Sequence, residues 1–279
     1  MTYLILAIIS SACVSIFMRL SERNMRSQMA MFMANYAVCS LLSIFYMDKG
    51  AGRLLGSTPN TALMFGAITG ILYLVSFVCM KHNMKFNGVV LTATFMKLGV
   101  LIPTLMAIFV FKETPGLLQM LGIVLAVLAI IIIHFEKGAF RHGNKKFWLL
   151  LLLILGGLGD AMINIYDKNG AANGKDGYLL VTFVVAFALA TLGAVFSKQR
   201  ACASDIFYGM LIGIPNYYSA RFLLLALGNV NAVLAYPMYS VATLVLITVV
   251  GILCFKENVS WKKATALVLI GVALCLLNI

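Results

Sequence analysis

Apolar runs of about 20 residues, separated by short polar breaks, occupy nearly the whole chain. A helix that spans a bilayer needs roughly 20 mainly apolar residues, whereas a membrane strand needs roughly 10 that alternate between apolar and polar. No run alternates in this way, so the pattern predicts helices and excludes a β-barrel. The ten predicted spans are 2–20, 28–47, 60–80, 87–110, 116–134, 147–166, 178–197, 205–227, 231–254 and 261–278.

Composition supports a membrane location. Hydrophobic residues make up 62% of the 279 residues and charged residues 11%, whereas about a quarter of the residues in soluble domains are charged. The first run starts at Thr2 without a basic leader or a small-residue cleavage site, so we expect a retained helix and not a signal peptide. The expected class is an all-α integral membrane protein, multi-pass in the cell (inner or plasma) membrane, without a soluble domain.

Charge and cysteine content change this picture little. The net charge is +12, but the basic residues lie mostly in short connections and form no extended face. Anionic lipid headgroups are therefore an expected partner, and nucleic acid is not. All six cysteines fall in apolar segments without the spacing of metal ligands, so we expect neither a metal site nor a cofactor.

Short motifs recur at a nearly constant offset in the two halves of the chain. The matching segments are Phe111-Lys112-Glu113 with Phe255-Lys256-Glu257, Asn87 with Asn231, and, at nearly the same offset, Gly66 and Gly70 with Gly209 and Gly213. Because five helices are an odd number, a second set of five enters the membrane from the opposite side. The sequence thus predicts two inverted five-helix repeats, 1–137 and 138–279, around a central cavity.

Three of the five prolines, Pro103, Pro215 and Pro237, lie inside predicted spans. Each proline removes a backbone donor and tends to kink its helix, which membranes tolerate where the freed groups face protein or a cavity. The kinks therefore serve either helix packing or a binding cavity.

Two opposite charges lie deep in predicted spans. Lys97 is ten residues into its run, which at 1.5 Å per residue places it about 15 Å in, near the bilayer midplane. Asp160 lies at similar depth and follows three closely spaced glycines. A charge at this depth costs about 2.5–3.5 kcal/mol, so we expect the two residues to form a pair. In a functional role, the pair opens on substrate binding or Asp160 takes up a proton as counter-ion. Alternatively, the pair only fixes the bundle as a static ion pair.

Arg221 and several aromatic or amide residues are candidates for the rest of a binding site. Arg221 lies near the end of its run and either reaches the headgroups or adds a second positive charge to the cavity. The candidate wall residues are Asn35, Tyr36, Tyr73, Asn216, Tyr217, Tyr218, Tyr236 and Tyr239, of which Tyr36, Tyr73 and Tyr217 fall in mid-span. Glu113 and Glu257, at helix–helix turns, are expected to be structural, next to the start of the following helix.

Several of these features together are typical of one group of transporters. They are the five-plus-five layout, the acidic turns at Glu113 and Glu257, a glycine in each following helix (Gly122 and Gly271), and the segments Phe95-Met96-Lys97, Gly156-Gly157-Leu158-Gly159-Asp160 and Gly213-Ile214-Pro215-Asn216-Tyr217. Over essentially its whole length the chain resembles the drug/metabolite transporter superfamily, in particular bacterial EamA-type permeases. The resemblance implies alternating access across a central cavity, in members that move amino acids, cationic drugs, choline-like compounds or phosphorylated sugars.

The expected function is secondary transport of a small polar metabolite, either a zwitterion like an amino acid or an organic anion. A zwitterion would satisfy Lys97 and Asp160 together, whereas an anion would use Lys97 with Arg221. No nucleotide-binding motif accompanies the spans, so proton or exchange coupling is expected. The alternative is efflux of hydrophobic cations by a multidrug permease, which Lys97 disfavours. An intramembrane enzyme is a remote alternative: the spans hold no pair of catalytic groups, and His82 and His142 fall in predicted connections.

Two arguments about orientation disagree. The odd-numbered connections hold fourteen lysines and arginines and the even-numbered ones hold five. By the positive-inside rule the odd connections are cytoplasmic and both termini lie outside. The family resemblance implies the reverse. We favour the charge count because all the connections are short enough for the rule to apply.

Overall fold

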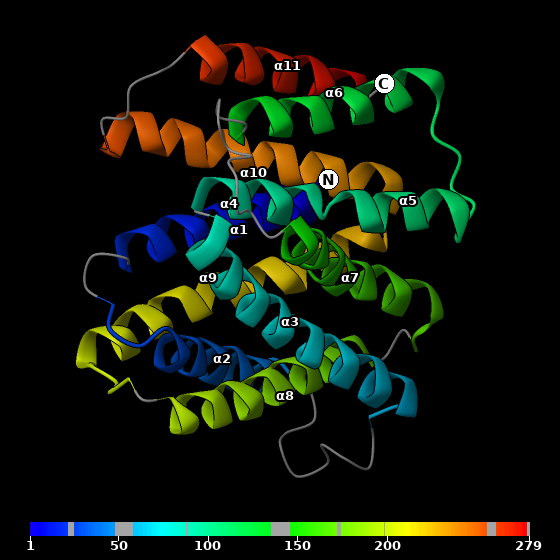
Figure 1. The fold of residues 1–279 in the computed structure, drawn as a ribbon. Coiled ribbons are helices and arrows are strands. Elements are labelled where there is room, and N and C mark those ends of the chain that lie inside the picture. Colours follow the sequence, from blue (N-terminus) through cyan, green and yellow to red (C-terminus); the bar gives the residue numbers. More distant parts are fainter. Residues whose placement is uncertain are drawn as a thin grey trace. The chain divides into compact units, whose positions relative to one another are not determined.

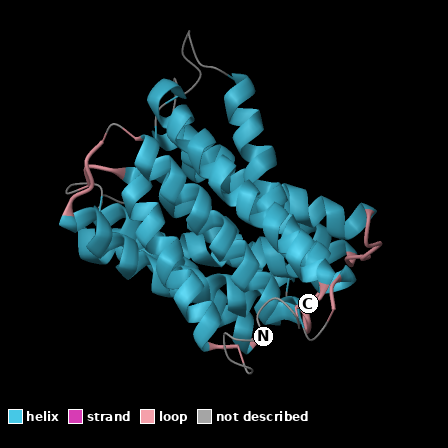
Figure 2. Ribbon diagram, turned by 90° about the horizontal axis from the view of Figure 1, so that it is seen from below, coloured by secondary structure: helices cyan, strands magenta, loops and turns pink. Residues whose placement is uncertain are grey.

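The computed structural model describes residues 1–21, 25–47, 58–87, 89–134, 146–171, 174–197, 199–255 and 261–277, and the regular elements in these ranges are helices (Figures 1 and 2). The helices are α1 (Thr2–Ser21), α2 (Gln28–Phe45), α3 (Asn60–Asn87), α4 (Val89–Leu98), α5 (Leu101–Phe109), α6 (Leu117–His134), α7 (Lys146–Asn169), α8 (Lys175–Phe196), α9 (Ala203–Leu227), α10 (Ala232–Phe255) and α11 (Trp261–Leu277). Within the described ranges, seven helices are long and apolar enough to cross a membrane, and three shorter stretches in α4–α5, α6 and α11 are also apolar.

The helices follow the predicted spans closely, with one extension. The third span was expected to end at residue 80, but α3 continues to Asn87. The added segment, residues 81–87, is polar and includes His82, which the sequence analysis placed in a connection. A polar segment interrupts the apolar run but can continue the helix, because lysine and methionine are good helix formers.

The predicted fourth span is interrupted two residues after Lys97. Pro103 has no N–H to donate to the carbonyl of Gly99, and the Ile102 N–H bonds that carbonyl at 3.0 Å instead. The Val100 N–H donates to the Lys97 carbonyl at 3.3 Å, again a bond over three residues that tightens the chain. The span therefore consists of two short helices, α4 and α5, whereas Pro215 and Pro237 lie inside continuous helices.

The chain divides into two compact units. Unit 1 contains residues Met1–Leu74 and Met162–Ala226, and unit 2 contains Val75–Ala161 and Leu227–Ile279. In unit 1, α2 lies beside α8, and in unit 2, α6 lies beside α11 (Figure 1). Each unit combines segments from both predicted halves, so the division into repeats 1–137 and 138–279 stays a prediction about sequence.

Glycines bring helix backbones into close contact within unit 1. A Cβ atom added to any of four glycines on α3 and α9 would lie less than 3.0 Å from a backbone carbonyl of the neighbouring helix. The contacts are Gly66 with Tyr178, Gly70 with Thr182, Gly209 with Met31 and Gly213 with Asn35. Small residues allow membrane helices to pack at this distance. The α3–α8 and α9–α2 interfaces therefore use the same spacing of two glycines four residues apart.

Glu113 fixes a turn in unit 2 and caps a distant helix. Its N–H bonds the Ala107 carbonyl at 2.9 Å, next to Lys112, whose φ of 54° is left-handed. Its carboxylate Oε2 accepts from the Val233 N–H at 2.8 Å, at the start of α10. The carboxylate thus has a structural role at the N-terminus of α10, which the sequence did not predict. Glu257 lies outside the described residues.

Candidate functional site

Lys97 and Asp160 belong to unit 2, in the last turn of α4 and in α7. Both side chains are half-buried and interact electrostatically. In the described part of the chain, however, the ion pairs within 4.0 Å are Lys175–Asp167 and Arg221–Asp176. The predicted direct ion pair is therefore not formed in the structure. The two opposite charges therefore interact without a contact ion pair.

Close packing of α7 against the break in the fourth span positions the two charges. A Cβ atom on Gly157 would lie less than 3.0 Å from the Gly99 carbonyl and from the Ile102 side chain, so only glycine fits there. On α10, the Tyr236 hydroxyl donates to the backbone carbonyl of Asp160 at 2.7 Å. The break two residues after Lys97 and the backbone of Asp160 are thus held by glycine contact and by a tyrosine hydrogen bond.

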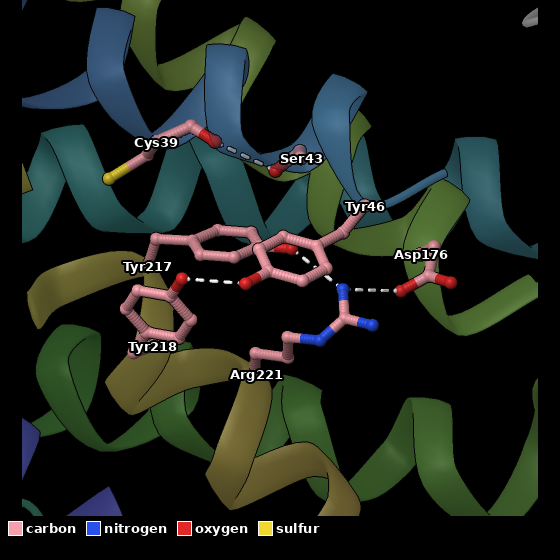
Figure 3. A network of polar contacts seen from close by, with 7 residues as sticks. All are labelled: Cys39, Ser43, Tyr46, Asp176, Tyr217, Tyr218 and Arg221. Carbon is pink, nitrogen blue, oxygen red and sulfur yellow. Dashed lines mark hydrogen bonds and ion pairs between the residues drawn. The ribbon is translucent and has the colours of Figure 1, made fainter. Parts of the chain in front are cut away.

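Arg221 is held in a cluster of tyrosines and one carboxylate in unit 1 (Figure 3). Its Nη1 donates to Asp176 Oδ1 at 2.8 Å and to the Tyr217 hydroxyl at 2.7 Å. Its guanidinium carbon lies 4.6 Å from the centre of the Tyr46 ring, within the range of a cation–π interaction. The Tyr46 and Tyr218 hydroxyls lie 2.8 Å apart. Arg221 therefore binds protein partners, and Asp176 neutralises its charge.

The other predicted site residues of unit 1 lie near this cluster or join α2 to α9. The Asn216 amide donates to Asn35 Oδ1 at 3.2 Å. Tyr36 is fully buried, with its ring centre 6.4 Å from that of Phe183, which in turn lies 6.1 Å from the Tyr217 ring.

Tyr73 is half-buried in α3 of unit 1. The structure thus groups Arg221 with Tyr217, Asn216 with Asn35, and Lys97 with Asp160. Each grouping lies within a single unit.

Sequence reasoning missed one buried amide. Asn164 on α7 is 1% exposed, and neither its nitrogen nor its oxygen has a hydrogen-bond partner among the described residues. The signal was available, because Asn164 follows Asp160 by one helical turn in an otherwise apolar run. Tyr46 and Asp176 were not predicted as site residues, because they lie at helix ends and resemble connection residues in the sequence.

Two further expectations are corrected by local packing. His82 lies within α3, with its ring centre 4.3 Å from Trp148 and 4.7 Å from Phe86, so it packs between aromatic rings. His142 lies outside the described residues. Cys202 lies just before α9 and not inside a span. There, hydrogen bonds from Ser204 lower the pKa of the Cys202 thiol.

Comparisons with known proteins give consistent results. The model of the EamA-like transporter family matches residues 1–135. An uncharacterized protein of Haemophilus influenzae is 24% identical over 269 residues, which are 92% of this chain and 90% of that protein. A solved crystal structure superposes with a TM-score of 0.76 at 13% identity, covering 99% of this chain and 96% of that chain. The similarity to the crystal structure concerns the fold.

Proposed function

We propose that the chain, whose residues 1–135 match the model of the EamA-like transporter family, is a secondary transporter of a zwitterionic, amino-acid-like metabolite. The observation that carries this proposal is the state of Lys97 and Asp160, two opposite charges in membrane spans that interact without a contact ion pair. A substrate carboxylate would pair with Lys97, and a substrate ammonium would pair with Asp160, so that each charge gains an opposite partner.

The partners of Arg221 favour a zwitterion over an organic anion. An anion was expected to use Arg221 as a second cation, but Asp176 and Tyr217 already bind its Nη1. The same cluster argues against efflux of hydrophobic cations, because its aromatic rings surround a protein cation. A substrate cation would also meet Lys97 beside the Asp160 carboxylate.

We further propose that repeats 1–137 and 138–279 are inverted and that they support alternating access. The matched glycine contacts of α3 with α8 and of α9 with α2 support this proposal, since inverted repeats place equivalent residues in equivalent interfaces. Coupling is proposed to occur by proton uptake at Asp160 or by exchange, and anionic lipid headgroups are the proposed partners of the basic connections.

If the substrate is a zwitterion, we expect the Arg221→Gln variant to retain most of the wild-type rate of amino acid uptake. The Asp160→Asn variant is expected to lose this uptake. The Arg221 change removes a partly exposed ion pair worth about 0.2–1 kcal/mol and a cation–π contact of about 0.5–2 kcal/mol, which affects stability more than binding. Uptake of radiolabelled amino acids and of organic anions into proteoliposomes measures both variants. Uptake of anions, and its loss in Arg221→Gln, would refute the zwitterion proposal.

Chemical labelling of a natural cysteine can determine the orientation of the protein in the membrane. Cys202 lies in the odd-numbered connection between α8 and α9, and its lowered thiol pKa raises the thiolate fraction that reacts with maleimides. The charge count predicts that a membrane-impermeant maleimide labels Cys202 only after cells are permeabilised. Cys202→Ser identifies the signal. Labelling of intact cells that disappears in Cys202→Ser would instead place the odd connections outside.

A further inference from the structure

We propose that the Arg221–Asp176 ion pair of unit 1 binds the headgroup of a membrane phospholipid that carries a phosphate and a hydrogen-bonding ammonium, as phosphatidylethanolamine does. The Arg221 guanidinium would bind the phosphate, and the Asp176 carboxylate would bind the ammonium. This inference goes beyond the proposed transport of a metabolite and does not depend on it. Its basis is an ion pair that is accessible at both charges and lies beside exposed apolar side chains.

Arg221 has hydrogen-bonding capacity that its protein partners do not use. A guanidinium carries five N–H groups, two of them on Nη1. Nη1 donates to Asp176 Oδ1 at 2.8 Å and to the Tyr217 hydroxyl at 2.7 Å, and Figure 3 shows both bonds meeting at this one nitrogen atom. The described residues supply no hydrogen-bond partner for Nε and Nη2. Three N–H groups in one plane are therefore left for a phosphate, whose oxygens can accept two of them at once.

Both charges of the pair are accessible to a ligand. The Arg221 side chain is 20% exposed and the Asp176 side chain is 40% exposed. Asp176 Oδ1 accepts from Arg221, whereas Oδ2 has no partner among the described residues. A carboxylate accepts hydrogen bonds at both oxygens, so an ammonium can bind Oδ2 without breaking the ion pair. Two neighbouring opposite charges complement a ligand that carries the same two charges in the opposite order.

The ion pair lies where membrane spans end. Asp176 is in the first turn of α8 and Tyr46 is the C-cap of α2, and both helices are long and apolar enough to cross a membrane. Lipid headgroups lie at the ends of such spans. The guanidinium carbon of Arg221 lies 4.6 Å from the centre of the Tyr46 ring, and tyrosine rings are typical of the membrane–water interface. The pair is therefore at the level where phosphate and ammonium groups of lipids are found.

An exposed apolar face of α2 adjoins the pair and fits the acyl chains of a lipid. Phe45 is 79% exposed, and Leu41, one turn earlier on the same face, is 65% exposed. The Phe45 ring packs edge-on against the Tyr46 ring, with the ring centres 5.5 Å apart. Apolar side chains that a spanning helix leaves uncovered face the acyl chains. A lipid held by its headgroup would lay its chains along this face, so we expect the whole lipid to bind more tightly than its headgroup alone.

The charges of the pair select among headgroups. A lipid such as phosphatidylglycerol brings its phosphate close to Asp176 and offers no ammonium to that carboxylate. A choline headgroup has both charges, but its nitrogen carries three methyl groups and no N–H, so it donates no hydrogen bond to Asp176. A primary ammonium supplies both the charge and the donor. The expected order of affinity therefore places phosphatidylethanolamine first.

The test titrates the purified full-length protein in detergent with dioleoyl phosphatidylethanolamine, phosphatidylcholine or phosphatidylglycerol, and native mass spectrometry measures the bound lipid. We expect wild type to bind phosphatidylethanolamine at least roughly threefold more tightly than the other two, the effect of one partly exposed ion pair. Asp176→Asn is expected to abolish this preference, and Asp176→Glu, which keeps the charge, is expected to retain it. Asp167→Asn is the matched control, because it removes the other ion pair at the start of α8, formed with Lys175 at 2.6 Å, and is expected to leave the preference unchanged.

Equal binding of the three lipids by wild type would overturn the inference. A preference for phosphatidylethanolamine that survives in Asp176→Asn, or one that disappears in Asp167→Asn as well, would also overturn it. Soluble O-phosphoethanolamine has the same headgroup chemistry without acyl chains, and we expect it not to displace the lipid at equal concentration. Displacement would assign the pair to a free metabolite and overturn the lipid. All these outcomes leave the zwitterion proposal to its own uptake experiment.

Discussion

Gly157→Ala is expected to lower the free energy of unfolding by roughly 1–3 kcal/mol and to abolish ligand binding. The added Cβ would lie less than 3.0 Å from the Gly99 carbonyl and from the Ile102 side chain. A backbone carbonyl cannot rotate away as a flexible side chain can, so α7 and the break between α4 and α5 must separate. Lys97 and Asp160 would separate with them.

The neighbouring glycine provides a matched control. A Cβ on Gly156 meets nothing within 4 Å, so Gly156→Ala is expected to be neutral or stabilising, since alanine is favoured over glycine by about 1 kcal/mol in a helix. Thermal unfolding of both variants in detergent, followed by ligand titration, measures the difference. Equal stability of the two variants would refute the close contact of Gly157 with Gly99.

A double-mutant cycle on Lys97 and Asp160 is expected to give an interaction energy of no more than about 1 kcal/mol in the ligand-free protein, while each single change abolishes the response to ligand. The two charges attract each other without a contact ion pair, so removal of one charge breaks no short ion pair of the other. A static buried ion pair would behave differently, because removal of one partner typically costs about 3–5 kcal/mol.

The cycle uses Lys97→Met, Asp160→Asn and the double variant, which preserve side-chain volume approximately. Thermal unfolding without ligand gives the interaction energy, and the shift with ligand gives the binding contribution of each charge. A large loss of stability in both single variants that the double variant recovers would establish a static pair. It would also remove Lys97 and Asp160 from the binding site.

The apolar pattern predicted the helices because membrane spans obey a strong length and polarity rule. It failed at residues 81–87, where a polar helix extends beyond the apolar run. It also missed the break after Lys97, although Pro103 was recognised, because the pattern does not say whether a proline bends a helix or interrupts it. Pro215 and Pro237 leave their helices continuous, so the outcome depends on local packing.

The sequence predicted which charged residues belong to the candidate site, but it did not predict which side chains contact one another there. Lys97 and Asp160 stand out in any apolar run, but whether they touch depends on the distance between two helices. Glu113 caps a helix that begins 119 positions later, which no local rule anticipates. The Asn164 amide has no hydrogen-bond partner among the described residues, and a sequence does not reveal which buried amides lack one.

The most direct test of the account is a ligand-dependent thermal-stability screen of wild type and Lys97→Ala with amino acids, phosphorylated metabolites and organic cations. A true substrate at 100 times its Kd stabilises the protein by about 2.7 kcal/mol. We expect amino acids to stabilise wild type and to leave a still-folded Lys97→Ala unchanged. Equal stabilisation of both proteins, or unfolding of Lys97→Ala in the absence of ligand, would contradict it and make Lys97 a structural residue.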